Sequence, residues 1–367
     1  MNYKKALYFI AKCLTITFEQ KNRDEIEFIL KTTDMDWDAV VKVSTGHYVF
    51  PALYCNLKRA NFLHYLPEEL VTYMKYITNL NRDRNEEIIT QARELNTLLL
   101  TNNITPLFLK GTGNLLAEIY EDIAERMVGD IDFVFSKAHY PKAITVLTKN
   151  GYFFVDKIPY ETPYRHYPRL KKKDRIAAVE IHHQISVRRY NKKFNYNFVK
   201  KDSQIINGVS VLSYANKLNL SIISNQINDK GFYYNTIALR NAYDVFLLSK
   251  KTNANDAVNL LEKLSNPLNC FLAACFEVFN NPRSLDYNKT KEVSWYLRVF
   301  NRQLTDLIPI KKQSKFNMIS RLIKRMFFIL YKSIFHLEYR DFLFECLTDK
   351  NWYIHKLIQF GIKKNLN

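Results

Sequence analysis

Glycine and proline are scarce in this chain of 367 residues, and their scarcity constrains the fold more than any other feature. The chain has Gly 8 and Pro 10, about 5% of its residues against an average of roughly 12%. Because both residue types mark turns, the shortage favours long helices over a many-turned β-sandwich or a dinucleotide-binding sheet with glycine-rich turns. Hydrophobic residues at 47% and charged residues at 25% exclude a largely disordered chain. A soluble protein with more than one core is expected.

The spacing of apolar residues divides the chain into three predicted domains: residues 1–102, 103–212 and 213–367. The first and third repeat apolar residues every three or four positions, which predicts helices. The middle region changes period, with predicted strands at 105–110, 130–135, 152–155 and 175–183 and predicted helices at 115–122 and 137–148. The predicted fold class is therefore α+β, a small mixed sheet with flanking helices embedded between N- and C-terminal helical regions.

Three acidic residues lie on predicted strands of the middle region. Asp130 and Asp132 are two positions apart, so a strand directs both side chains to one face. Glu180 and His182 share a face of another predicted strand in the same way. If the two strands are neighbours, the three carboxylates converge at one end of the sheet.

Converging carboxylates repel one another, and a cation between them relieves the repulsion. Carboxylate oxygens suit Mg²⁺ or Mn²⁺, and three acids are what two-metal phosphoryl transfer uses. The pattern therefore predicts that Asp130, Asp132 and Glu180 bind metal and are catalytic. A solvated strand end or salt-bridged acids are the alternative reading of the same residues.

A glycine turn precedes the acids in the sequence. Lys110-Gly111-Thr112-Gly113 lies where a strand is predicted to pass into a helix, and glycines there let the backbone approach a phosphate. The spacing is not that of a P-loop, and ordinary loop punctuation explains the glycines equally well. Arg126 is predicted either to pair with Asp130 or to reach a triphosphate.

These segments together resemble a known family. Leu109-Lys110-Gly111, the run from Arg126 to Asp132 and the segment Glu180-Ile181-His182 are similar to the uncharacterised nucleotidyltransferase family of the polymerase β-like superfamily. The resemblance extends from Thr105 to Asp244. Two features depart from the superfamily pattern: Gly111-Thr112 replaces its glycine–serine pair, and the interval from Gly111 to Asp130 is longer than in most members.

The resemblance implies both a fold and an activity. It implies a nucleotidyltransferase-type small mixed sheet, Mg²⁺ held by Asp130 and Asp132, and Glu180 as the third acid. It also implies a nucleoside triphosphate as donor and an acceptor hydroxyl on a saccharide, a protein or RNA, with a role in surface polysaccharide metabolism as one possibility. The phosphates would contact the segment from Lys110 to Gly113 and Arg126.

Two histidines are further candidate site residues. His182 is expected either to orient a neighbouring group by a hydrogen bond or to contact the substrate. His166 is a candidate substrate contact, in the segment Tyr164-Arg165-His166-Tyr167-Pro168. His183 points to the opposite face from His182, which predicts burial.

Positive charge is concentrated beside these residues. Residues 165–201 hold twelve Lys and Arg against two acids, a net +10 of the chain's +18. This basic tract indicates either a solvated surface or contact with a polyanion such as RNA or a triphosphate. Residues 311–332 form a second basic pattern, an amphipathic helix that is predicted to pack on the C-terminal core or to lie on a membrane surface.

Other classes of function remain open from the sequence. The same fold could serve as a non-catalytic nucleotide- or RNA-binding protein, or as a toxin–antitoxin type nucleotidyltransferase. The five scattered cysteines predict buried free thiols. Without a recognisable secretory signal or an apolar run long enough to span a bilayer, a cytoplasmic location is expected.

Overall fold

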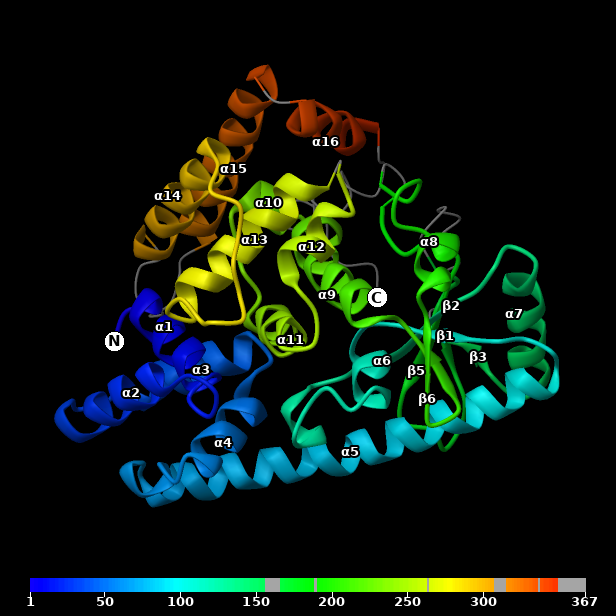
Figure 1. Cartoon of the computed structure of the whole chain (residues 1–367), viewed down its shortest axis with the longest axis horizontal. Coiled ribbons are helices and arrows are strands. Elements are labelled where there is room, and N and C mark those ends of the chain that lie inside the picture. Colours follow the sequence, from blue (N-terminus) through cyan, green and yellow to red (C-terminus); the bar gives the residue numbers. More distant parts are fainter. Residues whose placement is uncertain (156–165, 188–189, 263, 307–314, 336, 349–367) are drawn as a thin grey trace. The chain divides into compact units, whose positions relative to one another are not determined.

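The computed structural model describes residues 1–155, 166–187, 190–262, 264–306, 315–335 and 337–348, whose course is drawn in Figure 1. It divides into two compact units, Met1–Ile308 and Pro309–Asn367. The first unit holds the sheet and most of the described helices, and the described part of the second unit holds two helices. The predicted α+β class, with helical regions on either side of a mixed sheet, is confirmed. The finer division at residues 102 and 212 stays a prediction.

Helices make up the N-terminal part. They are α1 (Tyr3–Cys13), α2 (Gln20–Thr32), α3 (Trp37–Gly46), α4 (Phe50–Arg59) and α5 (Glu68–Thr101), with a short 3₁₀ turn at Leu63–Tyr65. The long helix α5 begins after Pro67 with Glu68 and Glu69, acids that suit the positive end of the helix dipole. It ends at Thr101, where the poor helix formers Thr101, Asn102 and Asn103 follow the last apolar residues. One face of α5 is buried against the core, and Figure 1 shows the helix running beside the sheet.

The sheet lies in the middle of the chain. Its described strands are β1 (Leu107–Phe108), β2 (Asp130–Val134), β3 (Phe153–Phe154), β4 (Leu170–Lys171), β5 (Ala178–His182), β6 (Gln204–Ile206) and β7 (Val209–Val211). Their order is β3-β4-β5-β2-β1-β7-β6. The pairs β2–β5 and β1–β7 are parallel, and the other neighbours are antiparallel. The central strands β1, β2 and β5 are apolar on the face away from the acids, where Phe133 and Ile181 are fully buried.

Most predicted elements of this region are present, and one is wrong. The helices between the strands are α6 (Lys110–Leu116), α7 (His139–Lys149) and α8 (Tyr196–Lys201), with a 3₁₀ turn at Ile123–Glu125. A helix was predicted over 115–122, but α6 begins five residues earlier and ends at Leu116. The glycine turn expected before the helix lies inside α6, where a Cβ atom on Gly111 or Gly113 would come too close to Val128 or Phe108. Strands β4, β6 and β7 were not predicted, since each is only two or three residues long.

The C-terminal part is helical, as predicted. It contains α9 (Tyr214–Ile223), a π-helical turn (Ser224–Asn228), α10 (Gly231–Tyr234), α11 (Leu239–Ser249), α12 (Ala254–Asn259), α13 (Ser265–Val278) and α14 (Lys291–Asp306) in the first unit, and α15 (Lys315–Phe335) and α16 (Leu337–Thr348) in the second. The helix predicted within 311–332 corresponds to α15, although residues 311–314 lie outside the described residues. In the described part of the chain, no helix is both long and apolar enough to cross a membrane.

A buried lysine in α9 makes stability depend on pH. Lys217 is 3% exposed and donates a hydrogen bond to the carbonyl oxygen of Leu212. Burial lowers the pKa of Lys217 to about 7, so the unfolded chain binds one more proton than the folded chain between about pH 7 and pH 10. This group therefore raises the free energy of unfolding by roughly 1 kcal/mol per pH unit as the pH rises through that window.

We expect Lys217→Met to remove this dependence and to stabilise the protein at and below pH 7. The measurement is urea denaturation of both proteins at several pH values between 6 and 10, compared as a difference so that other titrating groups cancel. The exposed Lys251→Met is the control and should leave the slope unchanged. Equal slopes for Lys217→Met and the wild type would show that Lys217 is not buried as a neutral amine.

Candidate active site

The acidic residues meet on one face of the central strands. Strands β2 and β5 are parallel neighbours, and their register places Asp132 beside Glu180 and Asp130 beside Ala178. The structure thus makes β5 the neighbour of β2, as convergence of the three acids requires. Asp132 is 6% exposed, whereas Asp130 and Glu180 are half-buried. Two carboxylates held side by side at this depth need positive charge nearby.

A histidine and a lysine supply hydrogen bonds to these carboxylates. The Nε2 atom of His182 lies 2.8 Å from Oδ1 of Asp132 and 3.4 Å from Oε2 of Glu180. The Nζ atom of Lys110 lies 2.5 Å from the same Asp132 oxygen and 3.4 Å from the same Glu180 oxygen. Because a carboxylate accepts, Nε2 donates its one hydrogen to Asp132, the nearer acid, and His182 thus holds Asp132 in position beside Glu180. This contact agrees with the orienting role predicted for His182.

The surroundings shift the pKa values of the two half-buried acids, Glu180 and Asp130, in opposite directions. Burial works to raise the pKa of Glu180, but the His182 hydrogen bond and the Lys110 charge outweigh burial and place the pKa well below its usual range. Burial raises the pKa of Asp130, and the negative charges of Glu180 and Asp132 raise it further. Among the described residues, Asp130 has an ion-pair contact with Arg169, whose Nη1 atom lies 4.0 Å from Oδ2. Asp130 is therefore the carboxylate with the weakest compensation in the cluster.

His166 lies at the edge of this cluster. It forms an isolated antiparallel bridge with His182, and the two rings are 5.1 Å apart. Its Nδ1 atom lies 2.8 Å from the carbonyl oxygen of Tyr167, and since a carbonyl only accepts, Nδ1 carries the hydrogen. Burial lowers the pKa of His166. The preceding residues Tyr164 and Arg165 lie outside the described residues.

The glycine segment lies directly against the acid-bearing strand. A Cβ atom on Gly111 would lie 2.8 Å from a methyl carbon of Val128, and one on Gly113 would lie 2.8 Å from the carbonyl oxygen of Phe108. The hydroxyl of Thr112 is buried and donates a 2.9 Å hydrogen bond to the main-chain carbonyl of Asp130. The glycines and Thr112 thus fix α6 against β1 and β2. Phosphate binding by Gly111, Thr112 and Gly113 remains a prediction.

The guanidinium of Arg126 lies against Gly111 and pairs with Asp244 rather than with the acids of β2 and β5. Its Nε atom lies 3.1 Å from Oδ1 of Asp244, and both side chains are buried. Tyr120 donates a 2.6 Å hydrogen bond to the same carboxylate. The predicted pairing of Arg126 with Asp130 is therefore wrong, because Asp244 on α11 provides a fully buried partner that the local sequence does not indicate. Contact of Arg126 with a triphosphate remains untested.

Amide side chains of α5 hold the segments that lead into both acid-bearing strands. Asn85 donates hydrogen bonds to the carbonyl oxygens of Ile123 and Arg126, at 2.6 and 2.7 Å. Gln91 makes two hydrogen bonds with the backbone of Ala177, the residue before β5. Asn85 and Gln91 were not predicted as site residues. The available signal was the run of polar residues that interrupts the otherwise apolar buried face of α5.

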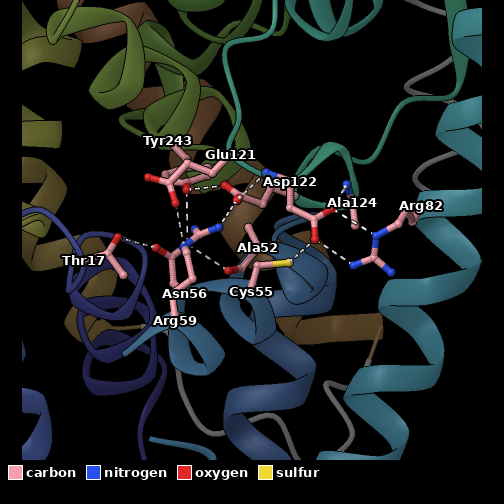
Figure 2. A network of polar contacts seen from close by, with 11 residues as sticks. Thr17, Ala52, Cys55, Asn56, Arg59, Arg82, Glu121, Asp122, Ala124 and Tyr243 are labelled. Atoms are coloured by element: carbon pink, nitrogen blue, oxygen red, sulfur yellow. Dashed lines mark hydrogen bonds and ion pairs between the residues drawn. The ribbon is translucent and has the colours of Figure 1, made fainter. Parts of the chain in front are cut away.

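A second buried network connects the N-terminal helices to the turn before β2 (Figure 2). Arg59 on α4 lies 2.5 Å from Oε1 of Glu125, and Tyr243 on α11 donates a 2.6 Å hydrogen bond to Oε2 of the same residue. Figure 2 also shows Arg82 of α5 bonded to Asp122, at 2.7 Å. The turn that precedes β2 is thus held by side chains of three helices outside the sheet, α4, α5 and α11.

The donor set fits a divalent cation. Asp132, Glu180 and His182 offer ligand atoms that all lie within 4.8 Å of one another. Two carboxylates match the oxygen preference of Mg²⁺ and Mn²⁺, and an imidazole nitrogen is more typical of Mn²⁺. Asp130 lies on the same face of β2 but outside this group. Two of the three predicted metal ligands, Asp132 and Glu180, thus lie in this group, and metal binding by Asp130, Asp132 and Glu180 stays a prediction.

Comparison with known proteins agrees with this geometry. No curated protein and no solved structure gives a significant match. Among protein-family models, the one described as uncharacterised nucleotidyltransferase matches residues 33–278. This range includes the acid-bearing strands, the glycine segment and the buried networks around them. Because the match covers more than half of the chain, the protein belongs to the uncharacterised nucleotidyltransferase family.

Proposed function

We propose that the protein is a Mg²⁺- or Mn²⁺-dependent nucleotidyltransferase that moves a nucleoside monophosphate from a nucleoside triphosphate to an acceptor hydroxyl. The observation that carries the proposal is the in-register pair Asp132 and Glu180 on adjacent parallel strands, bonded by His182 and Lys110, in a chain of this family. The acceptor hydroxyl loses its proton to solvent, its oxygen forms the new bond to the α-phosphorus, the α–β phosphoanhydride bond breaks, and pyrophosphate leaves.

Each residue of the cluster has a proposed role. Asp130, Asp132 and Glu180 would hold the divalent ion, which when bound neutralises charge on the phosphates. Glu180 would also orient the acceptor hydroxyl. His182 keeps Asp132 in one fixed arrangement beside Glu180 through its hydrogen bond. Such a fixed arrangement reduces the reorganisation that the reaction requires.

The phosphates and the acceptor would contact residues next to these acids, at the start of α6 and at His166. We propose that the start of α6 binds the phosphates through Lys110 and the Gly111-Thr112-Gly113 segment. Arg126, which lies against Gly111, would contribute positive charge to the same phosphates. His166, next to His182, is the proposed substrate contact. A cytoplasmic location and a role in surface polysaccharide metabolism belong to the same proposal.

The basic tract 165–201 gives the acceptor a candidate location. Within it, Lys192, Lys193 and Lys201 line a groove of about 430 Å³ together with Phe198 and Glu262. Three ammonium groups against one carboxylate favour a phosphate-bearing or otherwise anionic molecule. We therefore propose a polyanionic acceptor, with RNA as the first to be tested.

The direct test is pyrophosphate release by the purified full-length chain. The four nucleoside triphosphates are supplied with Mg²⁺ or Mn²⁺, each with and without single-stranded RNA, a nucleotide-free polysaccharide or protein as acceptor. We expect metal-dependent pyrophosphate release that one acceptor class increases. Nucleotide binding with no release for any acceptor would contradict the enzyme assignment and favour a non-catalytic nucleotide-binding protein.

A further inference from the structure

The ammonium group of Lys110 lies among the atoms that can bind the divalent ion. Its Nζ atom is 2.5 Å from Oδ1 of Asp132, 3.4 Å from Oε2 of Glu180 and 3.5 Å from Nε2 of His182. These three residues are the ones whose ligand atoms lie within 4.8 Å of one another. The three residues that Lys110 contacts are therefore the same three that could hold a metal ion.

The backbone fixes Lys110 in this place. Its φ angle is +50°, in the left-handed region that residues with a side chain rarely adopt. The conformation is imposed from both sides: Leu109 donates a hydrogen bond to the carbonyl of Asp132, and Gly111 packs against Val128. Backbone strain of this kind persists where the surroundings determine it, and it is concentrated at functional sites. The ammonium group thus points at the acids because the fold directs it there.

A divalent ion bound to Asp132 and Glu180 cannot leave this arrangement unchanged. Such an ion approaches carboxylate oxygens to about 2.0–2.6 Å, so the ammonium and the ion would be like charges in contact at a half-buried site. Their repulsion is strong where the effective dielectric constant is low. Oδ1 of Asp132 also already accepts hydrogen bonds from both Lys110 and His182. Metal binding therefore requires that Lys110 give up its contact with Asp132.

We propose that Lys110 is a built-in competitor for the metal site, and that it transfers its ammonium group from the carboxylates to the triphosphate when metal and nucleotide bind together. The inference rests on the proposed function and adds its regulation. The nucleotide offers the displaced ammonium new negative partners, so nucleotide binding should strengthen metal binding. By linkage, metal binding should strengthen nucleotide binding by the same factor.

The test is Mn²⁺ binding, followed by the electron paramagnetic resonance signal of the free ion, for the wild type and Lys110→Met. Without nucleotide, we expect Lys110→Met to bind Mn²⁺ roughly tenfold more tightly, within the usual range of coupling between sites. A non-hydrolysable triphosphate analogue should improve Mn²⁺ affinity in the wild type and much less in Lys110→Met. Lys110→Arg, which keeps the charge, should remain close to the wild type.

Controls separate this inference from the proposed function. Lys251→Met removes an exposed lysine outside the basic tract and should leave Mn²⁺ affinity unchanged. Thermal melting establishes that each variant is folded, and Lys110→Gln, with the same expected result, replaces Lys110→Met if that variant does not fold. If the wild type binds Mn²⁺ through Asp132 but neutral variants of Lys110 bind it no more tightly, the competition is overturned and the proposed function stands. If no protein binds Mn²⁺, both are overturned.

Discussion

Asp132→Asn is expected to lower nucleotidyl transfer by roughly 1,000-fold, because a metal contributes several kcal/mol of charge stabilisation to such reactions. Asp132 is the most buried of the three acids and accepts hydrogen bonds from both Lys110 and His182. Asparagine has nearly the same shape but supplies no negative charge to a divalent ion. The measurement is pyrophosphate release under saturating Mg²⁺ and triphosphate.

A matched control distinguishes loss of the metal ligand from loss of folding. Asp174→Asn makes the same chemical change in the exposed turn between β4 and β5, and asparagine tolerates the positive φ angle of Asp174. We expect this variant to keep full activity, and both variants to melt within a few degrees of the wild type. An Asp132→Asn protein that retains more than a tenth of the wild-type rate would rule out Asp132 as an essential metal ligand.

Asp244→Asn is expected to lower the free energy of unfolding by about 3–5 kcal/mol, the usual cost of removing one partner of a buried ion pair. Asp244 is 1% exposed and accepts bonds from Arg126 and Tyr120. Asparagine leaves the buried guanidinium of Arg126 without a compensating charge. Urea denaturation followed by circular dichroism measures the loss.

A double variant identifies the cause of that loss. In Arg126→Met/Asp244→Leu both charges are absent, and we expect it to be markedly more stable than Asp244→Asn alone. The double variant also tests whether Arg126 does more than support the fold. If it recovers stability but binds triphosphate as well as the wild type, the predicted contact of Arg126 with phosphate is excluded. If its stability is no higher than that of Asp244→Asn, the unpaired charge is not the cause.

The sequence was sufficient for elements whose residues follow a local pattern. The alternation around Asp132 and Glu180 predicts both strands, since a period of two identifies a half-buried strand without knowledge of its partner. The end of α5 at Thr101 is marked by a run of poor helix formers. By contrast, β4, β6 and β7 are too short to show a period, and their pairing partners come from other parts of the chain.

Only the site residues that lie on predicted strands could be identified from the sequence. The acids and His182 were found because they share faces of predicted strands. The partner of Arg126 was not found, because Asp244 lies 118 residues away on α11 and becomes its neighbour only in the folded chain. The place of Lys110 depends on a left-handed backbone angle that no spacing of residues indicates. The partner of Arg126 and the position of Lys110 therefore depend on long-range packing, which a local sequence pattern does not contain.

The central claim is that Asp132 and Glu180 bind a divalent ion. Anomalous X-ray diffraction from crystals soaked in Mn²⁺ tests it most directly, because it locates the ion independently of activity. We predict one anomalous peak within about 2.5 Å of carboxylate oxygens of both Asp132 and Glu180, and its loss in crystals of Asp132→Asn. Saturating Mn²⁺ with no peak at these carboxylates, or with a peak that persists in Asp132→Asn, would contradict the assignment.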